Sequence, residues 1–436
     1  MARELRVVCS GCKTVFRVKG AAVVLLGGLA FSYIAGAGEL DKALEMFEQL
    51  DRIGDWRALE SLGAVLFSGS KYREATKAYE RALVLLEKDR TVVPEKVNEV
   101  RYAHGRANAE WKCEGFYESI GKLAAEEQMQ RVREKFQEIH GSPVGVTWTI
   151  KDGIIEYIAL SGPELLWLQP LRGIQARSLN CYGSKIADLS PLKGMPLTYL
   201  NCGFTKVRDL SPLAGMPLTG LDCYNTPVRD LSPLKGMPLT TLNCQSTEVP
   251  DLSPLKGMRL TTLGCNSTQI SDLSPLKGMP LTTLYCHDTQ VSDLNPLAGM
   301  PLTTLYCNGT QISDLSPLKG MPLTTLECHD TQVSDLSPLA GMPLKLLVCS
   351  RTAISDLSPL KGMPLTTLHC SGTPVRDLSP LEGMKLEGLA FTPNRIEKGI
   401  EIIRAMKTLN RLSLNGQAWF APADFWKKYD AGEFNK

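Results

Sequence analysis

The sequence predicts an α/β repeat solenoid, with one strand per repeat in a parallel β-sheet, preceded by an all-α domain of helical hairpins. The main observation is a 21-residue internal repeat, and the second is a helical apolar pattern in the region before it. Solenoid repeats contact only their neighbours and expose a continuous surface, which suits binding better than chemistry. Ten cysteines mark the repeat: Cys181, Cys202, Cys223, Cys244, Cys265, Cys286, Cys307, Cys328, Cys349 and Cys370.

The composition is that of a soluble globular chain long enough for two or more domains. Of its 436 residues, 43% are apolar and 22% are charged, and 48 basic less 46 acidic residues leave a net charge of +2. This balance provides no positive field that would attract nucleic acid, so nucleic acid is not expected as a partner.

Each repeat begins with a short strand. In the repeat at 281–301, Leu284 and Cys286 alternate with Tyr285 and His287, which is the period of a strand with one buried face. Stacked repeats would then place the cysteines in one interior column. Neighbouring strands lie about 4.8 Å apart, whereas a disulfide brings β-carbons to about 3.8 Å. We therefore predict packed free thiols, and neither a disulfide ladder nor a metal chain.

After the strand, each repeat continues into Asp-Leu-Ser-Pro-Leu and ends with Gly and Met. This order predicts a helical segment with Ser as its N-cap, Pro at its first position and Gly at its end. Asn295 replaces the serine in one repeat, and asparagine is also a strong N-cap residue. Only about five residues separate cap and glycine, which favours a single 3-10 turn over a full helix.

The 21-residue frame extends beyond the cysteine repeats. It passes through Leu160 and Phe391, and a further strand is expected at 409–414, after a helical stretch at 396–406. We expect about thirteen coils in residues 144–416, with atypical ends that act as caps. The hairpin-like segment VTWTIKDGIIEYIAL would close the first edge of the sheet, and the C-terminal tail at 417–436 would cover the last.

The frame Leu-x-x-Leu-x-Cys-x-x-Thr resembles the leucine-rich-repeat signature, and SDLSPLKGM is similar to the short internalin-type repeats of bacterial proteins. This resemblance covers roughly residues 144–416. It implies a leucine-rich-repeat horseshoe or arc with a parallel β-sheet on the concave face, and it implies that this face binds a protein. Two columns depart from the family. Cys stands where the family has Leu, and this smaller side chain narrows the interior of the solenoid. Thr stands where the family has the Asn that usually joins neighbouring turns, so the sequence does not define the hydrogen bonds of that turn.

Residues 20–140 carry a different repeat. Segments 38–50 and 71–83 each place Ala, an aromatic residue and Leu or Ala at i, i+4 and i+7, so that Ala43 and Phe47 match Ala75 and Tyr79. Their spacing is close to the 34-residue period of a helical hairpin. The segments resemble tetratricopeptide repeats, which implies a groove that binds peptides. The alternative is a helical bundle that only caps the solenoid.

Residues 20–38 contain no charged side chain and approach the roughly 20 residues that span a bilayer. Five basic residues precede them, as the positive-inside rule requires of an anchor. Five glycines and the direct continuation into the helical repeat favour a buried helix instead. We therefore expect a cytoplasmic protein. A membrane association follows only if residues 20–38 form an anchor, with the repeats then outside the cytosol.

The N-terminal segment 1–19 contains Cys9 and Cys12 in VCSGCKTVF, which resembles one knuckle of a zinc ribbon. A tetrahedral zinc ion needs four ligands. The sequence has no second Cys-x-x-Cys pair, and His104 and Cys113 are the remote candidates. We interpret the segment as a partial knuckle, with zinc at Cys9 and Cys12 as the alternative. No other cofactor is expected.

No phosphate-binding loop or kinase signature occurs in the sequence, and no nucleophile, base and orienting group can be assembled from it. An enzyme is therefore not expected. The variable positions beside the strand frame are the candidates for partner binding, because the invariant positions build the fold. Tyrosines 285 and 306 would lie side by side. The candidate partner-binding residues are Tyr285, Tyr306, His287, Glu327, His329, Asp222 and Tyr224, and the alternative is ordinary variation on a solvated sheet.

Together these patterns predict a non-enzymatic bacterial protein-interaction scaffold. Its solenoid would bind a protein partner of unknown identity through the concave face, and its helical repeats would bind a peptide. Two alternatives remain: a membrane-anchored envelope or adhesion protein, and the sensor or regulatory part of a kinase-linked signalling system.

Overall fold

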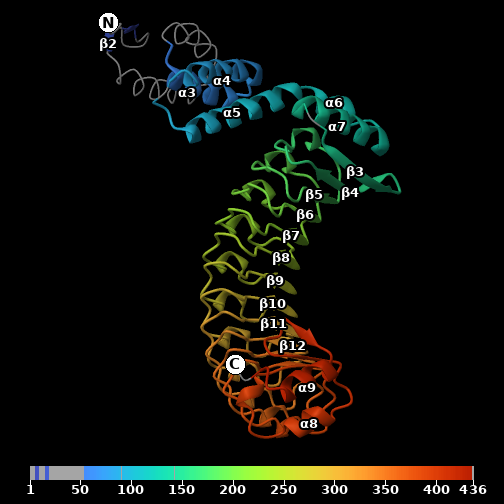
Figure 1. The fold of residues 1–436 in the computed structure, drawn as a ribbon. Helices are drawn as coiled ribbons and strands as arrows, with labels where there is room; N and C mark the ends of the chain where they lie inside the picture. The colour runs from blue at the N-terminus through green and yellow to red at the C-terminus, as the bar shows by residue number, and fades with distance from the viewer. Residues whose placement is uncertain (1–4, 9–14, 19–53, 90, 142, 435–436) are drawn as a thin grey trace. The chain divides into compact units, whose positions relative to one another are not determined.

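The computed structural model describes residues 5–8, 15–18, 54–89, 91–141 and 143–434. The chain divides into two compact units (Figure 1). The first comprises the helical region up to residue 142 together with Gln169–Leu171, and the second comprises the remainder up to residue 436. Cys9, Cys12 and the apolar segment 20–38 lie outside the described residues, as does the first predicted helical repeat at 38–50.

The first unit is built from helical hairpins, as the sequence predicts. Gly63 allows the first two helices to approach closely, because a β-carbon there would lie 2.8 Å from the ring of Tyr79. Among the described helices, none is both long and apolar enough to cross a membrane. The described elements are β1 Leu5–Val8 and β2 Val15–Val18, which pair antiparallel, and α3 Trp56–Ser68, α4 Tyr72–Leu86, α5 Pro94–Lys112, α6 Phe116–Ile120 and α7 Ala125–His140.

The second unit is a leucine-rich-repeat solenoid whose strands form one 15-stranded sheet in sequence order. Strands line its concave side and 3-10 turns line the other (Figure 1). The strands are β3 Gly145–Lys151, β4 Ile154–Ser161, β5 Ser178–Asn180, β6 Tyr199–Asn201, β7 Gly220–Asp222, β8 Thr241–Asn243, β9 Thr262–Gly264, β10 Thr283–Tyr285, β11 Thr304–Tyr306, β12 Thr325–Glu327, β13 Leu346–Val348, β14 Thr367–His369, β15 Gly388–Ala390, β16 Arg411–Ser413 and β17 Trp419–Phe420.

The core of each coil is a ring of aliphatic side chains and one thiol. In the coil at 281–301, the buried residues follow the predicted period, with Leu284 in the strand and Cys286 directly after it both 0% exposed. The same positions repeat in register, so that Leu284 pairs with Leu263 and Leu305 on the neighbouring strands. The apolar side chains of this coil are Leu281, Leu284, Cys286, Val291, Leu294, Leu297 and Met300.

Neighbouring coils are joined by backbone hydrogen bonds beyond the three-residue strands. The amide of Cys286 donates to the carbonyl of Tyr306 at 2.9 Å, and the amide of Asp288 donates to that of Asn308 at the same distance. On the other side of the strand, the hydroxyl of Thr303 donates to the carbonyl of Thr282 at 3.1 Å. These bonds satisfy backbone groups that a solenoid would otherwise bury without partners.

The position two residues after each repeat cysteine adopts a left-handed backbone conformation. Glycine accepts this conformation freely, and Asn and Asp accept it better than most residues do. Most members of the column fit this preference, whereas Phe204 and Arg351 are bulky exceptions. The column is Gly183, Phe204, Asn225, Ser246, Ser267, Asp288, Gly309, Asp330, Arg351 and Gly372, with φ between 52° and 72°.

The predicted 3-10 turn is present in every cysteine repeat, but its N-cap is not the predicted serine. In the turn Ser274–Leu276, the cap position is Leu273, and Ser274 and Pro275 are the first two residues of the turn. The carboxylate of Asp272 accepts the hydrogen bond from the amide of Ser274 at 2.7 Å. The aspartate two residues earlier therefore caps the turn, and Asp293 does the same for Asn295 at 2.8 Å.

The threonine that replaces the family's asparagine has a definite partner. The hydroxyl of Thr289 donates to the carbonyl of Cys286 in the same coil at 2.6 Å, and the residue is 7% exposed. Equivalent bonds recur along the column, for example from Thr247 to Cys244 at 2.6 Å. A threonine thus closes the turn within its own coil, and the main chain makes the bonds between coils.

Both ends of the sheet are capped as the sequence predicts. Strands β3 and β4 form an antiparallel hairpin at the first edge. At the other end, helix α8 Ile400–Ala405 precedes β16, β17 pairs antiparallel with β16, and helix α9 Pro422–Asp430 follows. Phe425 of α9 is fully buried and its ring centroid lies 5.7 Å from that of Phe391.

The two strand-core positions predict different mutational costs. Leu284→Ala should lower the free energy of unfolding by about 2 to 5 kcal/mol, because it leaves a cavity in a closely packed coil. Cys286→Ala removes only one sulfur atom and should cost visibly less. Urea denaturation followed by circular dichroism measures both. Equal losses would mean that the thiol has a bonding role beyond packing.

The column of left-handed residues two positions after each repeat cysteine, here called the left-handed column, gives a second test at the exposed residue Ser267. Ser267→Val should lower the free energy of unfolding by about 1 to 2 kcal/mol, because a β-branched residue is strained at positive φ. Ser267→Gly is the matched control and should change stability little, since glycine occupies the same position at Gly309 and Gly372. The prediction is wrong if thermal unfolding ranks valine equal to glycine.

Candidate functional site

The cysteine column is packed inside the solenoid and is not a reactive site. The eleven described cysteines are buried and form no disulfide with one another. Burial raises the pKa of the Cys286 thiol to about 12 and that of Cys307 well above its usual value. The thiolate is the reactive form. Across the described residues, no group of three or more His, Cys, Asp or Glu side chains could hold a metal ion.

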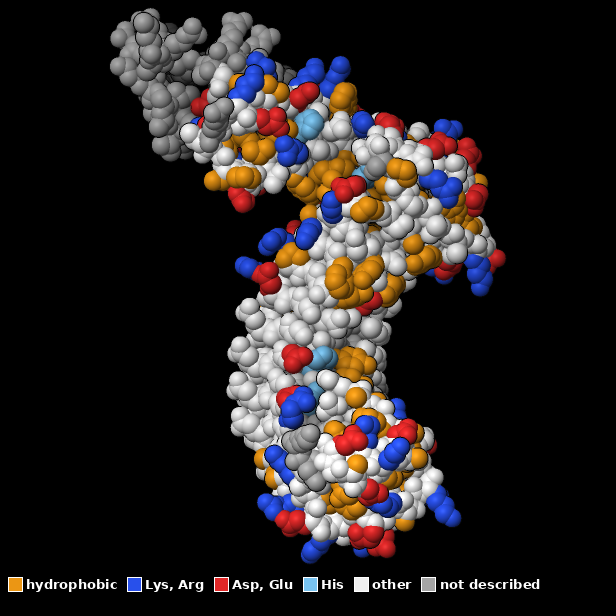
Figure 2. Space-filling model, viewed as in Figure 1, with side chains coloured by type: hydrophobic (Ala, Val, Ile, Leu, Met, Phe, Trp, Pro, Cys, Tyr) orange, Lys and Arg blue, Asp and Glu red, His pale blue; other side chains and the backbone are white. Residues whose placement is uncertain are grey.

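The strand face of the solenoid is almost free of charge. In the ten strands β5 to β14, Asp222 and Glu327 are the only charged residues, and none is basic. In the side view of Figure 2, much of the solenoid is pale, with a small group of acidic, basic and histidine side chains in its lower half. The variable residues of these strands are therefore mainly aromatic, amide and hydroxyl side chains.

Three of the predicted site residues form one aromatic group at the middle of this face. Tyr285 and Tyr306 pair in register on β10 and β11, and their rings meet edge to face with centroids 5.0 Å apart. The ring of His287 lies 6.3 Å from that of Tyr306. All three side chains are half-buried. The sequence correctly predicted that the two tyrosines lie side by side.

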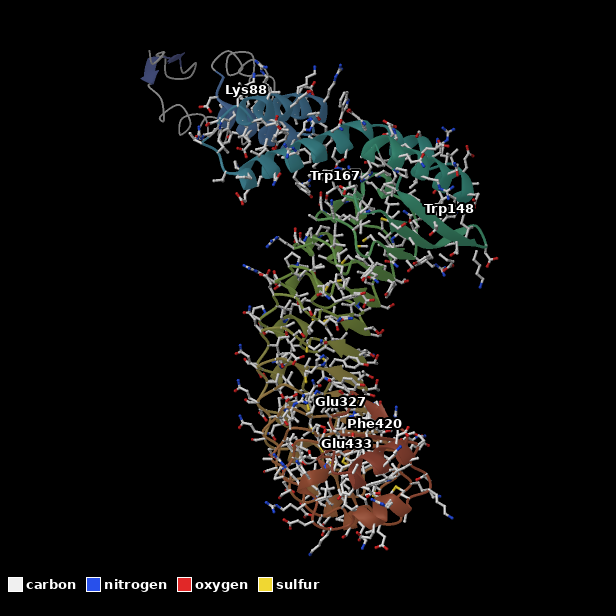
Figure 3. All side chains as sticks on the ribbon, in the orientation of Figure 1. Lys88, Trp148, Trp167, Glu327, Phe420 and Glu433 are labelled. Carbon is white, nitrogen blue, oxygen red and sulfur yellow. The ribbon has the colours of Figure 1, made fainter. Side chains whose placement is uncertain are left out.

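Glu327 extends this group onto β12, where it pairs in register with Tyr306 (Figure 3 labels Glu327). Tyr306 and Glu327 interact electrostatically. Burial raises the pKa of Glu327, and burial with the neighbouring carboxylate raises that of Tyr306. His329 lies 3.9 Å from the carboxylate of Asp330. Burial lowers the pKa of both His287 and His329, so both rings are neutral at pH 7.

Asp222 and the central aromatic residues line one hollow. Its volume is about 350 Å³, and its wall includes Asp222, Tyr285, His287 and Tyr306. Asp222 also accepts a hydrogen bond from the hydroxyl of Tyr199 on the neighbouring strand. The hollow exists because Gly264 stands between residues with side chains, Asn243 before it and Tyr285 after it in the same column. The sequence analysis did not single out Gly264.

Tyr224 belongs to a second aromatic group, nearer the first edge of the sheet. Its ring centroid lies 6.0 Å from that of Tyr182 and 5.6 Å from that of Phe204. Tyr182 is 47% and Phe204 is 50% exposed, which is unusual for large apolar side chains. The sequence analysis missed Phe204. The available signal was a phenylalanine in a column that otherwise favours Gly, Asn, Asp and Ser.

The C-terminal cap meets the strand face at His369. The ring of Trp419 lies 5.2 Å from the His369 ring, and the Arg411 guanidinium lies 4.7 Å from the Trp419 ring. A β-carbon at Gly416 would lie 3.1 Å from the Nδ1 atom of His369. Burial, with the nearby charge of Arg411, lowers the pKa of His369 to about 4.

The face therefore offers aromatic surfaces and hydrogen-bonding groups to a ligand. Its histidines are neutral, its Asp222 carboxylate accepts a hydrogen bond from the Tyr199 hydroxyl, and its Glu327 carboxylate lies beside Tyr306 in register. This chemistry suits recognition. Cys9 and Cys12 of the predicted partial knuckle, with zinc as the alternative, lie outside the described residues. His104 and Cys113 lie on or at the end of α5, with Cys113 fully buried.

The chain was compared with known proteins. No protein-family model matches it, and no curated protein sequence matches it. Among solved structures, internalin C2 from Listeria monocytogenes is similar over 50% of this chain and 84% of its own, with 28% identity and a TM-score of 0.32. The functional domain of InlJ from Listeria monocytogenes, described as including a cysteine ladder, is similar over 56% of this chain and 54% of its own, with 27% identity and a TM-score of 0.44.

A third similar structure is the leucine-rich repeat domain of APL1, over 61% of this chain and 78% of its own, with 18% identity and a TM-score of 0.43. The second unit has the regular strand and 3-10 turn of an internalin-like leucine-rich repeat every 21 residues, and a helical region precedes it.

The depressed pKa of His369 predicts a loss of stability in acid. The unfolded chain binds a proton at this histidine near pH 6.5, whereas the folded chain resists it down to about pH 4. The free energy of unfolding should therefore fall as the pH drops from 6.5 to 4. His369→Gln should reduce that fall. Urea denaturation at several pH values measures both curves, and parallel curves would contradict the prediction.

Proposed function

We propose that this chain is a non-enzymatic bacterial interaction protein whose solenoid binds a protein partner through its concave strand face. The observation that carries the proposal is the central aromatic group, defined here as Tyr285, Tyr306 and His287 together with Glu327. It lies at the middle of a strand face on which strands β5 to β14 carry no Lys or Arg. Tyrosines are frequent anchors at the centre of protein interfaces.

The geometry of the group supports this role. Its two tyrosine rings meet edge to face and are half-buried, so little side-chain freedom remains to be lost on binding. The backbone beneath it is fixed by the ladder of neighbouring coils. A partner would therefore meet a preorganised surface.

The helical unit is proposed as a second, tetratricopeptide-like binding module for a peptide. Support comes from the α3–α4 hairpin, in which Gly63 packs against Tyr79 and the buried Ala75 and Ala82 keep the helices close. The matching residues Ala43 and Phe47 lie outside the described part of the chain.

A cytoplasmic location is proposed as well. Free thiols seldom persist in oxidising compartments, and the solenoid contains a continuous column of them.

The test is an affinity pull-down from lysate with the full chain and two triple variants. Tyr285→Ala, Tyr306→Ala and His287→Ala remove the central aromatic group. Lys256→Ala, Lys277→Ala and Lys319→Ala form the matched control on the exposed 3-10 side. Both variants must first show the circular dichroism spectrum of the parent chain.

We expect a specific partner to bind the parent chain and the lysine control, and to be lost from the aromatic variant by about tenfold or more, as for an interface hot spot. A partner retained by the aromatic variant would move the binding surface away from the strand face. Recovery of no specific partner by the parent chain would contradict the proposed function.

A further inference from the structure

The hollow at Gly264 has a defined floor and two chemically different walls. Gly264 is the last residue of β9, and a β-carbon there would lie 2.9 Å from the Oδ1 atom of Asn243. On the other side stands the ring of Tyr285, which is the next residue in the same column. The absence of one side chain thus opens a gap between an amide wall and an aromatic wall.

The hollow contains an acceptor that the fold leaves unused. Asn266 lines it and is 6% exposed, yet its Oδ1 atom is buried without a hydrogen-bond partner. The Nδ1 atom of His287, which also lines the hollow, is buried without a partner too. A buried acceptor without a donor lowers stability. A ligand that brings hydrogen-bond donors would recover this energy.

The charged residues on the strands around the hollow are all acidic. Asp222 lines the hollow, Glu327 lies further along the same face, and strands β5 to β14 carry no Lys or Arg. The following column, from Tyr182 to Ser371, has no basic residue apart from its neutral histidines. Arg351 is the nearest basic exception in the left-handed column, and Asp330 pairs with it. A cationic group would therefore meet no repulsion from a free positive charge in these columns.

From these three observations we infer that the hollow at Gly264 receives a basic side chain of the protein partner, with arginine the best fit. The guanidinium group would lie against the Tyr285 ring, where cations are attracted within about 6 Å of the centroid. Its several N–H donors would meet Asn266, and this fork of donors distinguishes arginine from lysine. The Asp222 carboxylate, three strands from Tyr285 in the same column, would add negative charge to the site. The inference rests on the proposed function, and it names the chemistry of the partner's central contact.

Acid should weaken this contact. His287 forms part of the wall and faces Asp288 on its own turn, with His329 and its neighbour Asp330 two coils further on. Protonation of His287 would add a positive charge beside the bound cation. Protonation of Glu327, whose pKa burial raises, would act in the same direction because it removes negative charge.

The experiment titrates the full chain with the N-acetylated, amidated peptide Gly-Arg-Gly at neutral pH and low salt, using isothermal calorimetry. The same peptide with citrulline replaces the guanidinium by a neutral group of the same shape. Asp222→Asn removes the carboxylate. Gly264→Tyr fills the gap with a residue that the same column already accepts at Tyr285 and Tyr306. Glu382→Gln, an exposed residue on the 3-10 side, is the control for the change in net charge.

We expect saturable binding of the arginine peptide, binding of the citrulline peptide about tenfold weaker, and a loss of about fivefold or more in Asp222→Asn and Gly264→Tyr. Glu382→Gln should bind like the parent chain. Equal affinity for both peptides, no saturable binding, or unchanged binding in both hollow variants would each overturn the inference. Because the titration uses no lysate partner, its failure is distinguishable from failure of the pull-down.

Discussion

The structure depends on the register between neighbouring coils. Each strand from β5 to β16 is only three residues long, so the sheet alone provides few hydrogen bonds per coil. Further hydrogen bonds between coils flank each strand. They come from the amide of the cysteine, from the amide of the residue two positions after the cysteine, and from the hydroxyl of the threonine that precedes the strand. All of these require the next coil to be displaced by the same amount. The 21-residue period of the cysteine repeats provides this constant displacement.

The sequence was a good guide wherever a residue acts through burial or through the backbone. The alternation of Leu284 and Cys286 with Tyr285 predicted the strand and its buried face, because a strand has a side-chain period of two. The sequence also predicted the 3-10 turn, because only about five residues separate its start from the glycine that ends it. The sequence did not predict the capping residue, because Asp272 and Ser274 can both accept a hydrogen bond from a backbone amide, and only the conformation of the turn decides between them.

The candidate site was predictable in part. Side-by-side placement of Tyr285 and Tyr306 follows from the register, but the hollow beside them arises from a side chain that is missing, at Gly264. The sequence analysis considered the large side chains of this column as binding residues and did not consider Gly264. Similarly, the exposure of Phe204 depends on a positive φ that the sequence shows only through its neighbours in the column. The roles of the predicted residues in binding stay predictions.

The caps carry a consequence for how this solenoid can change over time. Internal coils have the same interface on both sides, whereas the β3–β4 hairpin and the segment from β16 to α9 each present a coil interface on one side only. Recombination between near-identical repeats could therefore insert or delete a whole coil without disturbing any contact, and would lengthen or shorten the sheet by about 4.8 Å each time. The aromatic group and the hollow depend on two neighbouring coils that differ from each other, because Gly264 in one lies beside Tyr285 in the next. Gain or loss of coils elsewhere would thus alter the reach of the surface while leaving its centre intact.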